Sequence, residues 1–465
     1  MKEKFDVVVI GAGAAGMTAA IFAARGASKV CVIEHRSEPG KKILQTGNGR
    51  CNLTHETVKA EDYGFTDKYK TDFLKSALKN FGVKETLAFF DSLGVPVRNK
   101  GGYIYPYSCT ALSVRNALWD EMKRLGIEIL VDTCVKSVSP VDTEFKKNTG
   151  NNQGAQAEFS ADVSGLEMKD RERASERITC KTHKGERSGF LLKVRILQRQ
   201  DAEEHVTQQI IYAKKLILAT GLCAAPKTGS DGTGIELASK LGLNVKTPLP
   251  SLVKLKCRGD FCKPASGVRH ISRVEIIADG KVIAEDTGEV QFTDDGISGI
   301  PVFNVSGDVS EALHEGRLVS ARLDLLPDIT KEQCEDFIEK KYDLMQERKI
   351  SGFFGGLLPV KLLTAVARSL GISAEKRTGD IGMTRVGQLL TKCKKWELEI
   401  KETYGFDHAQ VCRGGVDLSR LDPETMQVKE TPGLFIAGEL ADIDGPCGGY
   451  NLQWAWTSGA IAGRG

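Results

Sequence analysis

Three glycines near the N-terminus have the spacing of a dinucleotide-binding turn. Gly11, Gly13 and Gly16 directly follow the β-branched run 6–10. Such glycines permit a tight turn and let backbone N–H groups approach a pyrophosphate. Glu34 lies eighteen residues after Gly16, where a carboxylate can accept hydrogen bonds from ribose hydroxyls. The segment 6–34 therefore predicts a bound dinucleotide.

A second glycine-rich segment, 40–52, carries three cationic side chains and several amide or hydroxyl donors. This composition suits a ligand with phosphates and polar edges. Glycine-rich turns with lysines are also common as plain surface loops, so both interpretations stay open for this segment.

Two further turns have similar chemistry. The apolar run 208–218 ends in Ala219-Thr220-Gly221, and the run 433–437 leads into a loop with Glu439, Asp442 and Asp444. That loop closes in Gly448-Gly449-Tyr450 at the start of a predicted helix. Backbone N–H groups at a helix start favour negative charge, which the N1–C2=O region of a flavin gains on reduction.

Tyrosines are the candidate proton donors. Tyr103, Tyr105 and Tyr107 form a phenol-rich loop, and Tyr450 lies in the glycine-rich C-terminal loop. Each of them also fits the role of an ordinary packing aromatic. The sequence has no CxxC pair, so Cys51 and Cys447 are interpreted as small packing residues. The seven histidines lack ligand spacing, and we expect no metal.

The elements that must position these residues read as an α/β protein. Strands are predicted at 6–10, 29–33, 127–131, 190–197 and 208–218, and helices at 17–25, 67–92 with a break at Gly82, and 111–125. Short β-like runs follow at 273–278, 281–284 and 289–292, then helices at 331–347 and 360–370, and a last helix from Tyr450 to about Ala462.

A chain of 465 residues exceeds one ordinary core, so several domains are expected. We predict a cofactor domain in two parts, 1–246 and 406–465, with an inserted β-rich and helical cap at 247–405. The polar stretch 148–187 reads as a solvated insertion in the first part.

The charge balance excludes some partners. With 64 basic and 61 acidic residues, the chain has almost no net field to attract nucleic acid or anionic lipid. We expect a small-molecule substrate, no nucleic acid and no membrane span. Twelve scattered cysteines fit the reduced thiols of a cytoplasmic protein.

The segments GKKILQTGNGRCN and GLFIAGELADIDGPCGGYNLQWAWTSG resemble the hallmark segments of the BaiN/YhiN-type FAD-dependent flavoprotein family. The stretch 218–249 is similar to a third family segment. The resemblance implies a two-dinucleotide-fold, Rossmann-like FAD domain formed by both termini, with an inserted cap over the flavin.

The resemblance also implies roles for individual residues. Gly11, Gly13, Ala15 and Gly16 would hold the pyrophosphate, Glu34 the adenosine ribose, and Val135 the adenine through its backbone. The phosphate or flavin side would be contacted by Lys42, Thr46, Gly47, Asn48, Gly49, Arg50 and Asn52, with Thr220 and Gly221 passing close to the cofactor. The ribityl chain and ring would be contacted by Gly438, Glu439, Asp444, Gly449, Asn451 and Leu452.

The activity implied by the resemblance is reduction of conjugated C=C bonds in 3-oxo bile-acid or steroid intermediates, with NAD(P)H as transient electron donor. Such a reduction needs a hydride on the β-carbon and a proton on the α-carbon, and Tyr105 and Tyr450 are the predicted donors. Two other functions remain open: an FAD-dependent amine or amino-ketone oxidase, and an RNA-associated flavoprotein. The oligomeric state is not predicted.

Overall fold

The computed structural model describes residues 3–141, 157–158, 179–180, 189–200 and 203–465. The predicted insertion 148–187 lies outside the described residues, except for two short strands that pair with each other, β8 (Ala157–Glu158) and β9 (Thr179–Cys180). The chain forms two compact units. We call 1–222, 226–247 and 414–465 the sheet unit, and 223–225 with 248–413 the barrel unit.

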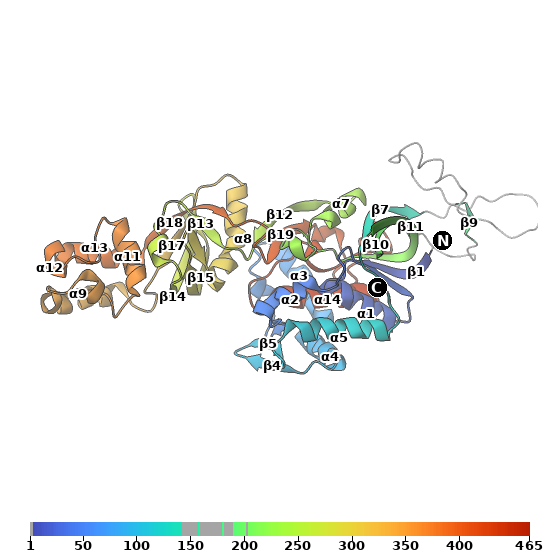
Figure 1. The fold of residues 1–465 in the computed structure, drawn as a ribbon, viewed down its shortest axis with the longest axis horizontal. Coiled ribbons are helices and arrows are strands. Elements are labelled where there is room, and N and C mark those ends of the chain that lie inside the picture. The colour runs from blue at the N-terminus through green and yellow to red at the C-terminus, as the bar shows by residue number, and fades with distance from the viewer. Residues whose placement is uncertain (1–2, 142–156, 159–178, 181–188, 201–202) are drawn as a thin grey trace, which may run out of the picture. The chain divides into compact units, whose positions relative to one another are not determined.

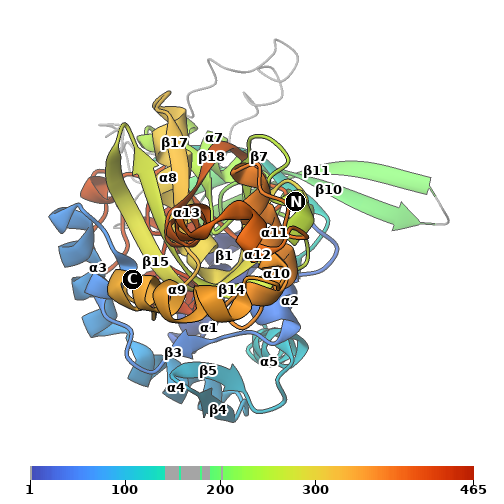
Figure 2. The same ribbon diagram turned by 90° about the vertical axis from the view of Figure 1, so that its left-hand side faces the viewer.

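The sheet unit is built on a mixed sheet. Its strand order is β6-β2-β1-β11-β10-β7, and β20 also pairs with β11. The strands are β1 (Glu3–Ile10), β2 (Val30–Ile33), β6 (Glu128–Leu130), β7 (Thr133–Val141), β10 (Gly189–Gln200), β11 (Glu203–Leu218) and β20 (Leu434–Ile436). Figure 2 shows β10 and β11 as a long antiparallel hairpin.

Five of these strands are parallel and end level with one another. Ile10 pairs with Ile33 and with Leu218, and Leu218 pairs with Ile436. β1 and β2 are almost wholly buried, because apolar β-branched runs suit a parallel sheet that is covered on both faces. All five carboxyl ends therefore lie at one edge of the sheet.

Helices cover this sheet. α1 packs against both α5 and α14, as Figure 1 shows. Gly459 and Gly463 allow the α14 contact, because a Cβ at either position would lie within 2.4 Å of an α1 carbonyl oxygen. The helices of the unit are α1 (Ala14–Arg25), α2 (Lys41–Gln45), α3 (Lys68–Asn80), α4 (Val83–Ser92), α5 (Ala111–Arg124), α7 (Thr233–Lys240) and α14 (Tyr450–Arg464).

Two small sheets complete the strand pairing. β3 (Thr54–His55), β5 (Tyr103–Pro106) and β4 (Val97–Lys100) form an antiparallel sheet within the sheet unit. β12 (Val245–Ser251) pairs with β19 (Val411–Val416), and each of these two strands crosses a unit boundary.

The barrel unit contains a closed barrel in the order β13-β16-β15-β14-β17-β18. Its strands are β13 (Leu255–Cys257), β14 (Arg269–Ala278), β15 (Lys281–Phe292), β16 (Gly296–Ser298), β17 (Val319–Asp324) and β18 (Trp396–Thr403). Its helices are α8 (Ile300–His314), α9 (Lys331–Met345), α10 (Ile350–Phe353), α11 (Val360–Ser369), α12 (Thr378–Ile381) and α13 (Met383–Lys394).

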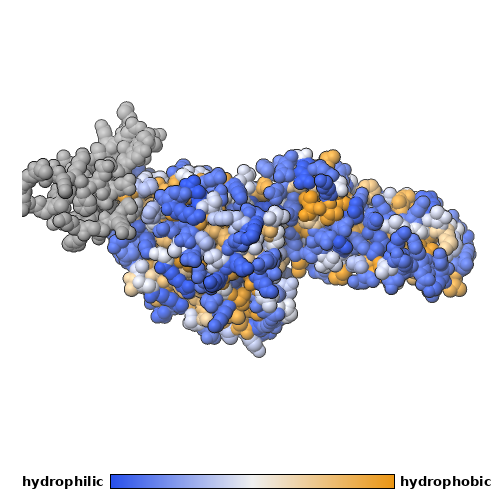
Figure 3. Space-filling view, turned by 180° about the vertical axis from the view of Figure 1, so that it is seen from behind, coloured by the Kyte–Doolittle hydropathy of each residue, from blue (hydrophilic) through white to orange (hydrophobic). Residues whose placement is uncertain are grey.

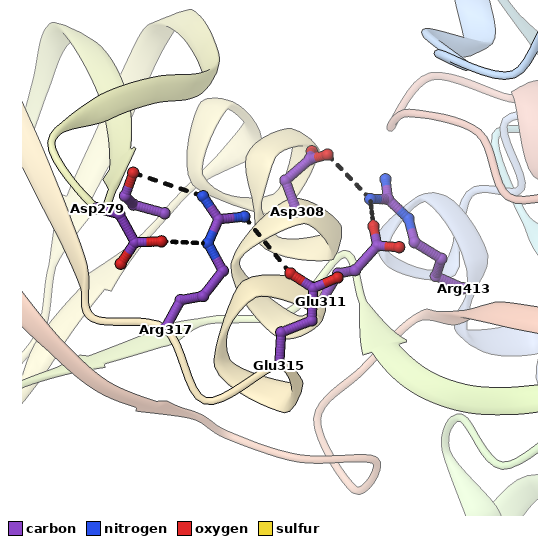
Figure 4. Close-up of polar contacts among 7 residues, drawn as sticks. Asp279, Asp308, Glu311, Glu315, Arg317 and Arg413 are labelled. Atoms are coloured by element: carbon purple, nitrogen blue, oxygen red, sulfur yellow. Dashed lines mark hydrogen bonds and ion pairs between the residues drawn. The ribbon is translucent and has the colours of Figure 1, made fainter.

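Ion pairs fix α8 within the barrel unit (Figure 4). Arg413 contacts Asp308 at 2.9 Å and Glu311 at 3.3 Å, both on α8. Just beyond the helix, Arg317 contacts Asp279 at 2.7 Å in the turn between β14 and β15. The C-terminal half of α8 and the residues just beyond it are thereby tied to other parts of the same unit.

Candidate cofactor and catalytic site

The predicted site segments meet at the carboxyl edge of the parallel sheet. Gly11 follows β1, Glu34 follows β2, Ala219 follows β11 and Ala437 follows β20. Ligands of open α/β sheets bind in the crevice outside this edge. Segments far apart in the chain thus reach one place through strand pairing.

The three glycines of the first turn have different roles. A Cβ at Gly11 would lie 2.5 Å from the Ala219 oxygen, and one at Gly16 would lie 1.8 Å from the Gly11 oxygen. Both positions therefore serve close packing of the turn. A Cβ at Gly13 would meet nothing within 4 Å. Gly13 also caps α1 without a side chain, so the space beside it and the first N–H groups of α1 suit a pyrophosphate.

Glu34 is buried, and part of its hydrogen-bonding capacity is used by the protein backbone. Its carboxylate accepts hydrogen bonds from the backbone N–H groups of Ala12 and Arg36, each at 2.9 Å. A carboxylate has about four acceptor positions, so ribose hydroxyls can still be accommodated. Glu34 consequently braces the glycine turn as well as presenting acceptors beside it.

The predicted 46–52 loop has a tightly turned backbone. Gly47, Asn48 and Gly49 all have positive φ, as does the buried Cys51. Gly47 to Arg50 are exposed, and the Thr46 hydroxyl donates to the Ile43 carbonyl at 2.6 Å.

Asn52 supplies a direct test of whether a flavin fits. The residue is only 7% exposed, and its Oδ1 accepts no hydrogen bond from any described residue. Buried polar atoms are nearly always paired, so this oxygen calls for a donor from a ligand or water. A flavin ring carries N–H donors, and the loop therefore fits that group.

Lys42 and Glu439 form an ion pair of 2.7 Å, joining the second glycine loop to the turn after β20. A Cβ at Gly221 would lie 3.9 Å from the same Glu439 carboxylate and 3.0 Å from the Ser230 hydroxyl. Gly221 and Glu439 are thus neighbours, while Thr220 packs against Gly234 of α7.

Glycines allow the C-terminal loop, residues 438–449, to pack closely against other segments of the sheet unit. A Cβ at Gly449 would lie 2.7 Å from the Thr54 backbone, and one at Gly438 would lie 2.8 Å from the Ala15 Cβ. Ala15 therefore packs beneath Gly438. Gly449 precedes α14 without a capping side chain, so the first N–H groups of the helix, including that of Leu452, remain for a ligand or water.

The Asn451 side chain holds this loop in shape. The Asn451 amide donates to the Gly445 carbonyl at 2.7 Å, and its Oδ1 accepts from the Gly445 N–H at 2.9 Å. Asp444 is buried, with 6% exposure. The Asn451 side chain thus has a loop-fixing role beyond the predicted cofactor contact.

Val135 lies on β7, close to the end of β2. The Thr133 N–H donates to the Glu34 carbonyl at 2.9 Å, two residues before Val135. The β7–β10 register shifts here, because Lys193 pairs with Ser137 while Val194 pairs with Val135. The irregularity begins two residues after Thr133, which contacts Glu34, and contact of Val135 with adenine stays a prediction.

Tyr450 belongs to an aromatic cluster that sequence reasoning did not find. Its ring stacks on His55 at 5.9 Å, and Tyr63 meets it edge-on at 5.5 Å. Tyr103 in turn contacts His55 edge-on at 5.3 Å. The four rings come from three separated parts of the chain, near residues 55–63, 103 and 450, so no local pattern could reveal the cluster.

The two phenols of Tyr63 and Tyr450 differ in whether they are already engaged in a hydrogen bond. Tyr63 is buried and donates to the Tyr450 backbone carbonyl at 2.8 Å, and burial holds its pKa well above the usual value. Within the described chain, no residue accepts a hydrogen bond from the Tyr450 phenol. Burial first, then Asp62 and Tyr103, raises the pKa of Tyr450, so this phenol stays protonated at neutral pH.

Tyr105 lies beside the second glycine loop. A Cβ at Gly47 would lie 3.6 Å from its ring. Burial raises the pKa of Tyr105, and the nearby Arg50 opposes that rise. Tyr105 is therefore a second protonated phenol next to a predicted flavin segment.

Neither metal ligation nor membrane crossing is indicated by the residues that the structure describes. No group of three His, Cys, Asp or Glu side chains there is arranged to hold a metal ion. None of the described helices is long and apolar enough to cross a membrane. Hydrophilic residues predominate on the face drawn in Figure 3.

Known proteins match almost the whole chain. A family model described as HI0933-like protein Rossmann domain matches residues 5–162 and 177–465. The 3-dehydro-bile acid delta(4,6)-reductase of Clostridium scindens is 35% identical over 458 residues, covering 98% of this chain and 97% of that protein. The ribosomal RNA dihydrouridine synthase of Escherichia coli is 25% identical over 464 residues, covering 98% and 96%. A crystal structure of 3-ketosteroid-delta4-(5alpha)-dehydrogenase from Rhodococcus jostii shares 16% identity over 99% of this chain and 95% of that one, with a TM-score of 0.44.

Proposed function

Because this chain belongs to the family of HI0933-like Rossmann-domain proteins and is an FAD-dependent oxidoreductase, we propose that it reduces a C=C bond conjugated to a carbonyl group. Its substrate in this proposal is a 3-oxo bile acid or related steroid, as free acid or thioester. The observation that carries the proposal is the 35% identity to a 3-dehydro-bile acid reductase over 98% of the chain.

The reaction class also agrees with the more distant relative. A dihydrouridine synthase is named for uridine reduced at its C5=C6 bond, which is conjugated to the C4 carbonyl. A 3-oxo-Δ4 steroid has the same unit, a double bond next to a ketone. The names of both relatives thus describe reduction of an α,β-unsaturated carbonyl, although the molecules that carry it differ.

The chain's own residues provide binding and orientation in this proposal. The space beside Gly13 and the start of α1 take the pyrophosphate, and Glu34 takes the ribose. Asn52 Oδ1 would accept from a ring N–H, and the start of α14 would favour the negative charge that the N1–C2=O region gains on reduction. When bound, FAD supplies the hydride, and NAD(P)H is the proposed source of electrons.

Tyr450 is the proposed proton donor for the α-carbon. It is the first residue of α14, and its ring is held between His55 and Tyr63. A fixed, protonated phenol can deliver a proton without the side chain having to be reoriented. Tyr105, beside Gly47, is the alternative donor in the same proposal.

Product analysis tests the proposal. The purified protein with FAD, NADH or NADPH and a 3-oxo-Δ4 bile acid, incubated without oxygen, should yield a product heavier by two hydrogen atoms. Absence of that product with each nicotinamide, in a protein that retains FAD, would contradict the proposed substrate.

A second candidate function is reduction of uridine in ribosomal RNA, which the 25% identity to the Escherichia coli enzyme favours. The same incubation with unmodified ribosomal RNA, followed by nucleoside digestion, separates the two candidates. Dihydrouridine without any reduced steroid would select the RNA function.

A further inference from the structure

His35 and Arg36, the two residues after Glu34, contact the segment 226–231. His35 Nδ1 lies 3.3 Å from Glu34 Oε1, and its Nε2 lies 3.5 Å from Asp231 Oδ2. The Arg36 guanidinium donates to the Pro226 carbonyl at 3.0 Å. We call residues 226–231 the strap.

The strap is anchored at both ends in the sheet unit. It begins five residues after Gly221, beyond residues 223–225 of the barrel unit, and leads into α7, where Asp231 accepts from the Thr233 hydroxyl at 2.8 Å. In its middle, Gly229 has a φ of +119°, and a Cβ there would lie 3.2 Å from the His35 ring. The strap backbone therefore passes directly against His35.

His35 thus lies within ion-pair distance of two carboxylates with different roles, while its buried Nε2 makes no hydrogen bond to any described residue. Glu34 is the acid proposed for the ribose, and Asp231 organises the start of α7. The imidazole packs against Glu34 Oε1, which also accepts from the Arg36 N–H, whereas the Ala12 N–H donates to Oε2. The imidazole also couples the Glu34 side chain to the position of the strap.

We propose that His35 is a positioning residue for the adenosine half of FAD, acting through Glu34 and through its contact with Asp231. This inference rests on the proposed FAD site. Without the His35 imidazole, the Glu34 side chain has more rotational freedom, and the strap loses its contact with His35. FAD then dissociates faster, whereas FMN, which lacks the adenosine half, is unaffected.

The test compares His35→Ala with the wild-type protein. FAD release after dilution, followed by flavin fluorescence, should be about tenfold faster in the variant, equivalent to about 1.4 kcal/mol. The dissociation constant for FMN should be the same in both proteins. Asp231→Asn should accelerate FAD release in the same direction, and the double variant should show less than the combined effect because both residues act through one contact.

Two further variants serve as comparisons. His314→Ala removes an exposed histidine of the barrel unit and should release FAD at the wild-type rate. His35→Gln, which keeps a side-chain donor, should recover part of the loss, and the thermal midpoints of the apoproteins should agree.

Equal FAD release from wild type and His35→Ala, or an equal loss of FMN affinity, would overturn the positioning role while leaving the FAD site intact. A wild-type protein that binds no FAD would instead overturn the proposed function itself.

Discussion

Gly13 is the residue whose substitution separates cofactor binding from folding. Its Cβ position is open and its φ is negative, so Gly13→Val should be tolerated by the fold. The valine would occupy the space proposed for the pyrophosphate. We expect the purified variant to lack bound FAD by absorbance and to keep the thermal midpoint of the wild-type apoprotein.

Gly356→Val is the matched control for this change. Gly356 is exposed in the barrel unit, and a Cβ there would also meet nothing within 4 Å. This control should retain FAD. Full flavin absorbance in Gly13→Val would refute the placement of the pyrophosphate.

Tyr450→Phe tests the proton donor. The variant keeps the ring that stacks on His55 but lacks the phenol. Reduction of the bound flavin by NAD(P)H should be unchanged, while its reoxidation by the enone slows about 100-fold, because proton transfer contributes on that scale.

Tyr107→Phe is the comparison for Tyr450→Phe, since Tyr107 is 61% exposed and its ring lies 3.9 Å from the Arg98 guanidinium. Wild-type reoxidation in Tyr450→Phe together with slow reoxidation in Tyr105→Phe would move the donor role to Tyr105.

At the scale of elements, local patterns predicted the parts of the sheet unit that position the site. The break at Gly82 is confirmed between α3 and α4, and the predicted helix 111–125 is observed as α5, Ala111–Arg124. The predicted strand 208–218 is confirmed within the longer β11. These elements have strong apolar periodicity or end at a glycine that interrupts the helix. Both signals can be recognised in the sequence without knowledge of tertiary contacts.

The barrel unit was predicted less well. The separate runs 281–284 and 289–292 are one strand, β15, because the polar stretch between them pairs with β14 instead of turning.

α8 was not predicted. Its sequence contains Gly307 and several β-branched residues, and Gly307 lies against the Arg413 guanidinium, 2.7 Å from its Cβ position. The closed barrel depends on such non-local contacts.

The junction of α1 and α5 makes a prediction about acid stability. Glu121 accepts from Arg124 at 2.6 Å and pairs with Arg25 of α1 at 2.9 Å. The hydrogen bond from Arg124, and then that from Arg25, lowers the pKa of Glu121 from 4.5 to about 2. The depressed pKa means that the stabilisation is present above about pH 4.5 and is lost as pH falls toward 2.

Glu121→Gln should therefore lower the free energy of unfolding near neutral pH by about 1–2 kcal/mol, since both arginines are partly exposed and screened. The difference from wild type should shrink below about pH 4.5 in denaturant titrations. Glu236→Gln, in an exposed pair with Lys240, should change little. An equal deficit of Glu121→Gln at every pH would contradict the electrostatic explanation.

For the whole molecule, the site depends on chain ends that meet in one sheet. β1 and β20 lie on either side of β11, although hundreds of residues separate them in sequence. The glycine motifs at both ends were visible in the sequence, but the His55 cluster and the strap contact were not, because their partners meet only after this assembly.

We propose that the protein passes electrons from a nicotinamide through FAD to a conjugated enone. Anaerobic stopped-flow absorbance at the flavin band tests it most directly, first with NADH or NADPH and then with a 3-oxo-Δ4 bile acid added to the reduced protein. We expect bleaching of the flavin band by the nicotinamide and return of its absorbance with the enone. Bleaching only by an amine, with recovery only in oxygen, would contradict the proposal and identify an oxidase.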